Sequence, residues 1–363
     1  MEILNNIFLY FFAFIILLSI IVFVHEFGHY IVAIINKVKV ETFSIGFGKE
    51  IIGWNDKRGT RWKISLLPFG GYVKMYGEDI FSKKKIPSQL KQYAFSNKKI
   101  YQRFLIVAAG PLANFIFAII CLAFLYTFIG KQITPPIINE VENNSPASKV
   151  DLRKDDQIIK IENKSIDDFR DIPTYLLIYQ KKEFINFDIK RNNEIILKKI
   201  KPEFVEEVHY GQKRKIPKIG ISSYDHVQKK YPFYQSVYLG TKSTYEICSL
   251  TLKGLYLLII GKGSKEDIGG PIKIAQISGQ FLEAGILSFI NLIILLSISI
   301  GLINLFPIPM LDGGHLVMYT VEFLIGRPVN KNIQEKIYKF GFAVIITLAV
   351  FLTYNDIINL INF

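Results

Sequence analysis

Long apolar runs separated by polar segments dominate the pattern of this 363-residue chain. A helix needs about 20 apolar residues to cross the roughly 30 Å hydrocarbon core of a bilayer. Four runs free of charged residues approach or exceed that length, at residues 7–24, 104–129, 286–311 and 340–355. The first suffices if its helix continues to about Ile35, and the last if Asp356 lies at the far interface. The pattern therefore predicts a polytopic α-helical membrane protein with four transmembrane helices.

The loop after the first run, residues 36–100, contains a pattern of a different period. Apolar and polar residues alternate over 61–66 and again over 72–76, on either side of the sequence PFGG at 68–71. Alternation of period two is typical of strands, and a Gly-containing link between two strands favours a hairpin. We predict a β-hairpin in this loop that turns at PFGG.

The segment between the second and third runs has a mixed pattern. Residues 131–204 predict one small α+β domain, with a helix over 171–182 and a hairpin over 183–200 that points Ile185, Phe187 and Ile189 to one face. Residues 205–235 predict no particular fold, whereas 236–260 favour an amphipathic helix on the membrane surface over a fifth span. We therefore divide the chain into the first two spans with their loop, the inserted domain, a connector, and the last two spans, at residues 1–130, 131–204, 205–284 and 285–363.

Charge predicts the orientation of the spans. The chain carries a formal net charge of +13, and the loop 36–103 alone holds 15 basic and 5 acidic residues. Cytoplasmic loops are enriched in Lys and Arg, so this loop and the basic link between the last two spans are expected in the cytoplasm, with both termini outside. The first run follows no basic residue and precedes no small-x-small site, so we expect it to remain as a span rather than to be cleaved. The charge is thus a topology signal, and we expect no nucleic-acid partner.

Two histidines and a glutamate interrupt the first apolar run, in the sequence IVFVHEFGHYIV at 21–32. Ionisable residues at this depth cost roughly 2.5–3.5 kcal/mol each on insertion scales, so they rarely occur there without a function. On a helix, His25 and His29 lie one turn apart on the same face, a spacing that lets both bind one Zn²⁺. Glu26 is then placed to accept a proton from an attacking water.

A catalytic zinc site needs a third protein ligand, and depth selects it. His209 and His226 belong to the outer segment, on the wrong side of the membrane. The third run ends in NLFPIPMLDGGHL at 304–316, where prolines and glycines break the helix at the depth of the two histidines. We predict Asp312 as the third ligand and assign His315 to packing or to a hydrogen bond behind the ligands.

Together these motifs resemble the bacterial site-2 proteases, close to the regulator of sigma-E type. Besides HEFGH, the resemblance is carried by SIGFGKE (44–50), LPFGGYVKM (67–75), AAGPLANF (108–115), GGPIKIA (269–275) and NLFPIPMLDGGH (304–315). It implies an intramembrane zinc endopeptidase with Zn²⁺ on His25, His29 and Asp312, and Glu26 as general base. It also implies that Asn304 donates to the developing oxyanion.

The resemblance carries further expectations about substrates. It implies a re-entrant hairpin beside the active site whose edge, around Gly70, Gly71 and Tyr72, pairs with an unwound substrate, and it places Asn114 in contact with substrate. Expected substrates are single-span proteins of a bacterial inner membrane, such as trimmed anti-sigma factors or remnant signal peptides.

The inserted domain resembles a PDZ domain. It would bind a peptide or protein, or exclude bulky substrates. Asp151 and Asp155 replace two glycines of the family pattern A-G-L-x-x-G-D, and because Asp tolerates left-handed backbone, we expect the turns to survive.

Two other classes of protein remain open. A membrane-anchored PDZ adaptor with a structural zinc site would not need Glu26 or the broken third span, and such a site is usually closed by a fourth ligand. A prenyl-protein protease would take its third ligand from a downstream glutamate, for which the last two spans offer only Glu322.

Overall fold

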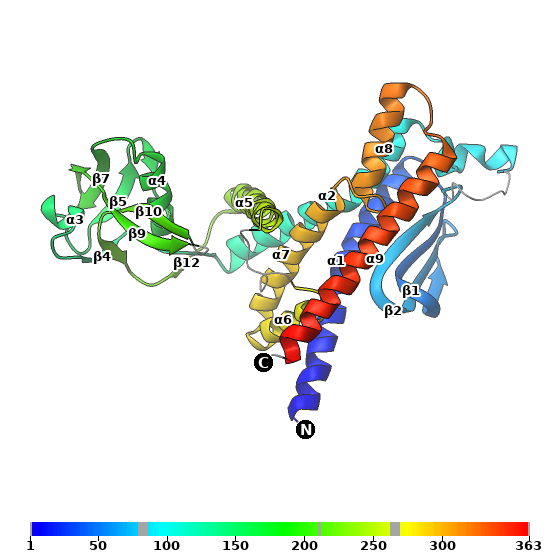
Figure 1. The fold of residues 1–363 in the computed structure, drawn as a ribbon, viewed down its shortest axis with the longest axis horizontal. Helices are drawn as coiled ribbons and strands as arrows, with labels where there is room; N and C mark the ends of the chain where they lie inside the picture. The colour runs from blue at the N-terminus through cyan, green and yellow to red at the C-terminus, as the bar shows by residue number, and fades with distance from the viewer. Residues whose placement is uncertain (1, 79–85, 210–211, 262–268, 362–363) are drawn as a thin grey trace. The chain divides into compact units, whose positions relative to one another are not determined.

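The computed structural model describes residues 2–78, 86–209, 212–261 and 269–361. Contacts divide the chain into two compact units, residues 1–122 with 237–363, and residues 123–236. The elements of the first unit are α1 (Glu2–Ile35), β1 (Val40–Asn55), β2 (Arg61–Met75), the 3₁₀ turns η1 (Ser88–Tyr93) and η2 (Phe95–Asn97), α2 (Ile100–Phe128), α5 (Phe233–Ile259), α6 (Pro271–Glu283), α7 (Ile286–Asn304), α8 (Asp312–Ile325) and α9 (Lys331–Ile361) (Figure 1). The last residues of α2 and the first residues of α5 belong to the second unit.

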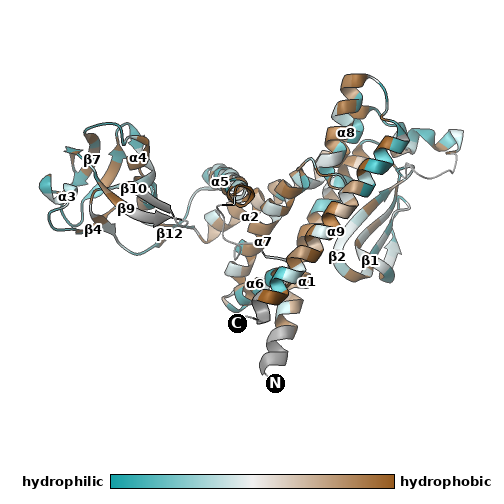
Figure 2. Ribbon diagram, viewed as in Figure 1, coloured by the Kyte–Doolittle hydropathy of each residue, from teal (hydrophilic) through white to brown (hydrophobic). Residues whose placement is uncertain are grey.

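Four helices of the described residues are long and apolar enough to cross a membrane: Phe8–Ile35, Ile100–Phe128, Ile286–Asn304 and Asn332–Ile358. They correspond to the four predicted spans, and Figure 2 shows long hydrophobic stretches along α1, α7 and α9. The prediction of a polytopic membrane protein is therefore confirmed. Helix α5 is not among these four, and its position on the membrane surface stays a prediction.

Helix α1 continues through both histidines, as the first span requires. It ends at Ile35, where the Asn36 side chain donates to the carbonyl of Val32 at 2.8 Å and Lys37 adopts a left-handed backbone with φ of 56°. A left-handed residue after the last turn is a common helix terminator. The helix is thus long enough to carry His25 and His29 well away from either end.

Small residues bring the helices of the first unit close together. A Cβ added to Gly28 of α1 would lie 2.3 Å from the carbonyl oxygen of Ala109 in α2, and one added to Gly301 of α7 would lie 3.1 Å from the Pro111 oxygen. Small residues at crossings let helix backbones approach closely, the usual mode of packing in membranes. Helix α2 is therefore held near both α1 and α7.

The chain breaks between α7 and α8, as predicted from its prolines. Pro307 and Pro309 fall in the gap, and Met310 has a left-handed backbone with φ of 80°. A Cβ at Gly313 would lie 2.1 Å from the carbonyl oxygen of Phe306, so only glycine permits this tight return. The break starts α8 at Asp312.

The β-hairpin turns at the predicted place and also at one that was not predicted. PFGG lies inside β2, and the turn between β1 and β2 is formed by residues 56–60. Asp56 makes this turn because its Oδ1 accepts from the backbone N–H groups of Arg58 at 2.8 Å and Thr60 at 2.9 Å. Each strand also folds back on itself, because residues 42–45 pair with 61–64 on one side and, in the opposite direction, with 71–74 on the other. The chain of β2 therefore reverses between residues 64 and 71, which confirms the predicted turn at PFGG.

The hairpin is attached to α1 next to the second histidine. Tyr30 of α1 and the indole of Trp62 both donate to Asp56 Oδ2, at 3.0 and 3.1 Å. The rings of Phe43 and Trp62 stack with centroids 4.2 Å apart. The sheet therefore packs on α1 through an aromatic cluster anchored by one carboxylate.

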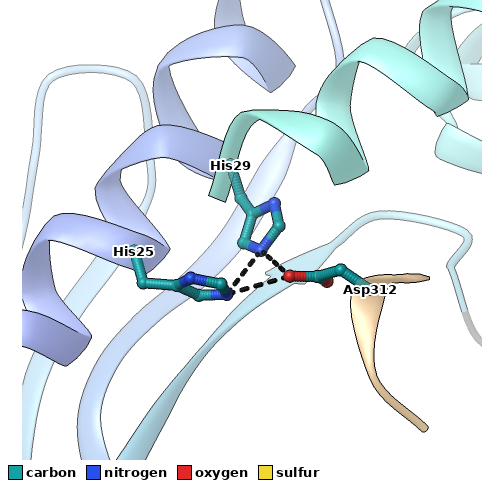
Figure 3. A group of neighbouring side chains, drawn as sticks. All are labelled: His25, His29 and Asp312. Atoms are coloured by element: carbon teal, nitrogen blue, oxygen red, sulfur yellow. Dashed lines mark hydrogen bonds and ion pairs between the residues drawn. The ribbon is translucent and has the colours of Figure 1, made fainter. Parts of the chain in front are cut away.

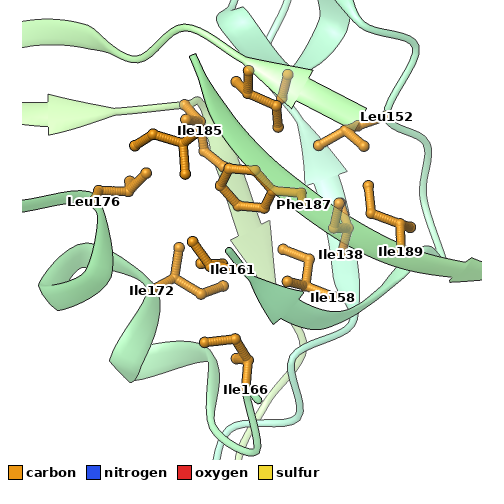
Figure 4. Packing of buried hydrophobic residues seen from close by; sticks show 13 residues of the cluster. Ile138, Leu152, Ile158, Ile161, Ile166, Ile172, Leu176, Ile185, Phe187 and Ile189 are labelled. Carbon is orange, nitrogen blue, oxygen red and sulfur yellow. The ribbon is translucent and has the colours of Figure 1, made fainter. Parts of the chain in front are cut away.

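The second unit is an α+β fold around one apolar core. Its elements are β3 (Lys131–Ile133), β4 (Ile138–Val141), α3 (Pro146–Lys149), β5 (Gln157–Ile161), β6 (Lys164–Ser165), η3 (Phe169–Asp171), α4 (Ile172–Ile178), β7 (Ile185–Arg191), β8 (Glu194–Ile200), β9 (Glu203–His209), β10 (Gln212–Lys218), β11 (Ile221–Ser223) and β12 (Val227–Lys229). The main sheet has the order β6-β5-β7-β8, and β3 pairs with β12, β4 with β11 and β9 with β10. Ile185, Phe187 and Ile189 are all buried in the core, as predicted from their alternation (Figure 4).

Turn residues of the second unit also match the sequence analysis. Asp151 and Asp155, which replace the family's glycines, have left-handed backbones with φ of 57° and 69°. The neighbouring Asp156 is buried and accepts two hydrogen bonds of 2.7 Å from the Arg191 guanidinium. The turns survive, and Asp156, the aspartate that ends the pattern, anchors strand β7 through Arg191.

The connector contains a helix that was not predicted. Helix α6 begins at Pro271, and the buried Asp356 of α9 accepts from the backbone N–H groups of Gly270, Ile272 and Lys273 at 2.8–3.1 Å. The N–H groups of the first helical turn lack partners within their own helix. A carboxylate there stabilises the helix, because it accepts hydrogen bonds from these groups and its negative charge interacts favourably with the helix dipole. Asp356 thus joins the last span to α6.

Candidate metal centre

The two histidines of α1 and the aspartate that opens α8 converge (Figure 3). His25 Nε2 lies 3.0 Å from Asp312 Oδ2 and 3.2 Å from His29 Nε2, and the third edge, from His29 Nε2 to Asp312 Oδ2, is 3.5 Å. Both histidines are buried, and Asp312 is half-buried. Sequence analysis selected these three residues, and the structure brings them together.

The ring of His29 is fixed by the backbone of α2. Its Nδ1 lies 2.9 Å from the carbonyl oxygen of Ile106, which can only accept, so Nδ1 carries the proton and donates. Nε2 is then unprotonated and directs its lone pair toward His25 and Asp312. This arrangement is typical of metal-binding histidines, whose second ring nitrogen donates to a carbonyl or carboxylate.

Three observations indicate that this set of donor atoms fits a zinc ion. Ligands about 2.0–2.1 Å from a tetrahedral zinc are about 3.3 Å apart, close to the three edges of this triangle. Asp312 Oδ2 is buried and has no hydrogen-bond donor among the described residues. Space next to the imidazoles is kept by Gly110 of α2, where an added Cβ would lie 2.3 Å from His29 Nε2 and 2.9 Å from His25 Nε2. The residues present therefore fit a zinc ion.

Glu26 lies between this triangle and the hairpin. It is half-buried, and the backbone of Val73 in β2 hydrogen-bonds to its carboxylate. A Cβ on Gly71 would lie 3.2 Å from Glu26 Cγ and 2.6 Å from a methyl carbon of Val22. Strand β2 therefore packs on α1 at Glu26, so a β-strand lies beside this carboxylate, next to His25 in the chain.

The remaining predicted residues lie around this centre. Asn304 is half-buried and ends α7 just before the break. Tyr72 stacks on Phe47 with centroids 6.0 Å apart, and Gly70 has a φ of 119° that favours glycine. Asn114 is fully buried, with its amide facing the His25 ring. Their roles toward substrate stay predictions.

His315 and Glu322 have other partners. The Tyr338 hydroxyl lies 3.1 Å from His315 Nδ1, which agrees with the assignment of His315 to packing or hydrogen bonding. Glu322 is buried, accepts from Arg103 at 3.0 Å and also accepts the Val329 backbone N–H. The residue that a prenyl-protein protease would use as a ligand is therefore engaged in an ion pair.

Two features of the site were missed by sequence analysis. Gly110 stands in AAGP, where its function depends on the crossing of α1 and α2, which no local pattern reveals. Arg103 was counted only as a topology signal, yet it pairs with Glu322 and lies 4.8 Å from the Tyr319 ring centroid. This ion pair attaches α8, which carries Asp312, to the start of α2.

Comparison with known proteins gives consistent matches over most of the chain. The model of peptidase family M50 matches residues 13–348. A protein of Rickettsia conorii is 41% identical over 96% of this chain and 99% of its own length. Proteins of Agrobacterium fabrum and Clostridium acetobutylicum are 37% and 33% identical, covering 97% and 95% of this chain and 97% and 96% of their own lengths. All three carry the printed name "putative zinc metalloprotease".

Proposed function

Because the chain belongs to peptidase family M50 and is a zinc metalloprotease, we propose that it is an endopeptidase that cleaves transmembrane segments of single-span proteins inside the membrane. One observation carries the proposal. Two of the three donors of the triangle, His25 and His29, lie on a helix, Phe8–Ile35, that is long and apolar enough to cross a membrane. A hydrolytic site on such a helix has membrane-embedded peptide bonds as its nearest substrates.

His25, His29 and Asp312 would hold the ion. When bound, zinc supplies polarisation of the scissile carbonyl and lowers the pKa of water to about 7. Glu26 acts as general base, accepting a proton from the attacking water and delivering it to the leaving amine. Its contact with β2 keeps the carboxylate on the hairpin side of α1. Asn304, at the end of α7, donates to the oxyanion in this proposal.

The hairpin presents the substrate in this proposal. A helical substrate hides its peptide bonds in its own hydrogen bonds, so it must be extended before cleavage. Strand β2 passes Glu26 at Gly71 and Val73, and added strands bind such edges through main-chain hydrogen bonds. Gly70, Gly71 and Tyr72 then align the extended segment beside the catalytic carboxylate.

The cellular setting follows from charge and topology. We place the protein in a bacterial inner membrane, with the basic hairpin loop in the cytoplasm and both termini outside. The second unit acts there as a PDZ-like domain that binds a peptide or excludes bulky substrates. Substrates of this class are membrane proteins already shortened outside, such as anti-sigma factors, or remnant signal peptides.

A structural-zinc adaptor is the weaker alternative for this chain. The family is one of peptidases, and the triangle offers three donors with Glu26 beside them, whereas a structural site usually has four ligands.

The test uses the purified full-length chain in detergent, its zinc content and a single-span test protein. We expect Glu26→Gln to keep its zinc and to lose at least about 100-fold in cleavage rate, because a general base contributes that much. His25→Ala should lose both zinc and cleavage. The matched control is Glu246→Gln, an exposed glutamate of α5 paired with Lys242, which should behave as wild type. A Glu26→Gln variant that still cuts, or an enzyme that cuts soluble peptides and no membrane segment, would contradict the proposal.

A further inference from the structure

Asn114 of α2 is a buried polar residue that the mechanism does not use. Its side chain is fully buried, and its Nδ2 lies 3.4 Å from His25 Nδ1. Its Oδ1 is buried with no hydrogen-bond donor among the described residues. A buried amide oxygen without a partner costs about 1–3 kcal/mol, so such an arrangement calls for a cause.

The two nitrogens of the His25 ring have opposite requirements. Nε2 faces Asp312 and His29, and there it must offer a lone pair to act as a zinc ligand. A neutral imidazole with a free Nε2 carries its proton on Nδ1, which then needs an acceptor. The nitrogen of an amide cannot accept, so Nδ1–H and the Asn114 NH₂ would face each other as two donors.

We propose that Asn114 is a positioning residue whose Oδ1 accepts the Nδ1–H of His25 and so fixes the ligand's tautomer and ring plane. A half-turn of the amide exchanges its oxygen and nitrogen, which are nearly the same size, without moving its neighbours. This turn gives Oδ1 the donor it lacks and gives Nδ1–H its acceptor. The inference rests on the proposed assignment of His25 as a zinc ligand.

The surroundings make Asn114 a rigid support for the ring. The buried Ser297 of α7 donates to its backbone carbonyl at 3.1 Å, and Gly301 of α7 brings the helix backbone close, with an added Cβ only 3.1 Å from Asn114 Cβ. The side chain is thus fixed between α7 and the ring. His29 is held in the same way by the Ile106 carbonyl, so α2 would orient both imidazoles, one through its backbone and one through a side chain.

The test measures zinc affinity of the full-length protein by competition with a chelator, independently of proteolysis. Asn114→Leu keeps the size but removes the acceptor, and should weaken zinc binding about 10–100-fold, the usual effect of losing such a partner. Asn114→Asp keeps the acceptor and loses the donor, and should bind zinc at least as tightly as wild type. The matched control is Thr127→Val in the same helix, which removes a hydroxyl that donates to the Ala123 carbonyl, and should change affinity less than threefold.

A spectroscopic readout separates positioning from packing. In the Co²⁺-substituted protein, Asn114→Leu should shift the visible absorption bands of the metal, whereas Asn114→Asp should leave four-coordinate bands like those of wild type. If Asn114→Leu does not unfold cooperatively, Asn114→Ala replaces it as the variant without an acceptor, with the same expected loss.

Two results would overturn the inference. Wild-type zinc affinity in the variants without an acceptor excludes a supporting hydrogen bond, and a tenfold or greater loss in Asn114→Asp shows that the amide donates instead. His25→Ala is measured in parallel. If it keeps its zinc, the ligand assignment of the proposed function fails, whereas if it loses zinc while the Asn114 variants do not, only this inference fails.

Discussion

Adding one methyl group at Gly110 should displace the imidazole rings of His25 and His29, although the substitution replaces no charged or metal-binding residue. The Cβ of Gly110→Ala would lie 2.3 Å from His29 Nε2 and 2.9 Å from His25 Nε2. Ordinary contacts of a methyl carbon begin at about 3.4 Å, so the ring and helix must separate by about 1 Å. Zinc–ligand distances tolerate changes of only about 0.2 Å, so this displacement of the rings weakens zinc binding.

The size of this effect follows from the cost of overpacking. Extra methyl groups in a packed interior cost about 1–3 kcal/mol, and 1.4 kcal/mol is a factor of ten. We therefore expect zinc affinity to fall about 5–150-fold, with cleavage falling in parallel at limiting zinc.

The assay is chelator competition on full-length protein, with thermal unfolding measured in high zinc to check the fold. The control is Gly254→Ala in α5, where an added Cβ meets nothing within 4 Å. It should leave zinc affinity unchanged. A Gly110→Ala protein with wild-type zinc affinity would refute the claim that this glycine maintains the ligand space.

Three further outcomes test the scaffold. Arg103→Ala leaves the buried Glu322 carboxylate without its cation and should lower the free energy of unfolding by about 3–5 kcal/mol, measured by thermal or denaturant unfolding in detergent; no loss would mean the pair is not buried in the membrane-bound protein. Partial burial raises the pKa of Asp56, but hydrogen bonds from Trp62 and its other donors outweigh this, and the folded pKa lies below the ordinary value of 3.8. Its stabilisation is thus present above about pH 4 and lost as pH falls through the folded pKa, which Trp62 fluorescence should report and Asp56→Asn should abolish. Asp356→Ala removes the cap of α6 and should increase hydrogen exchange at Gly270, Ile272 and Lys273, by an amount that corresponds to about 0.5–2 kcal/mol; unchanged exchange would show that the cap is dispensable.

The sequence was most informative where function sets residue identity. His25, Glu26 and His29 interrupt an apolar helix that would otherwise exclude them, and Asp312 followed from its depth and from the breakers around it. Left-handed turns at Asp151 and Asp155 were likewise predictable, because few residues other than glycine adopt that backbone.

Prediction failed where distant contacts decide the local structure. The turn at PFGG was predicted, but the pairing of residues 42–45 with both halves of β2 was not, because it joins segments that lie far apart in the chain. The cap on α6 comes from Asp356, far along the chain. Gly110 keeps space for the two imidazoles only because α1 and α2 cross there, and no local pattern reveals that crossing. Such features follow from tertiary packing rather than from local propensity.

The origin of the donor triangle also bears on how the enzyme is made. The two imidazoles and the glutamate lie on the first helix, whereas the carboxylate opens α8, so residues 30–311 must be synthesised before the set is complete. Chains emerge from the ribosome amino terminus first, at roughly 5–20 residues per second. A nascent chain therefore carries no complete donor set until residue 312 has been translated, late in synthesis.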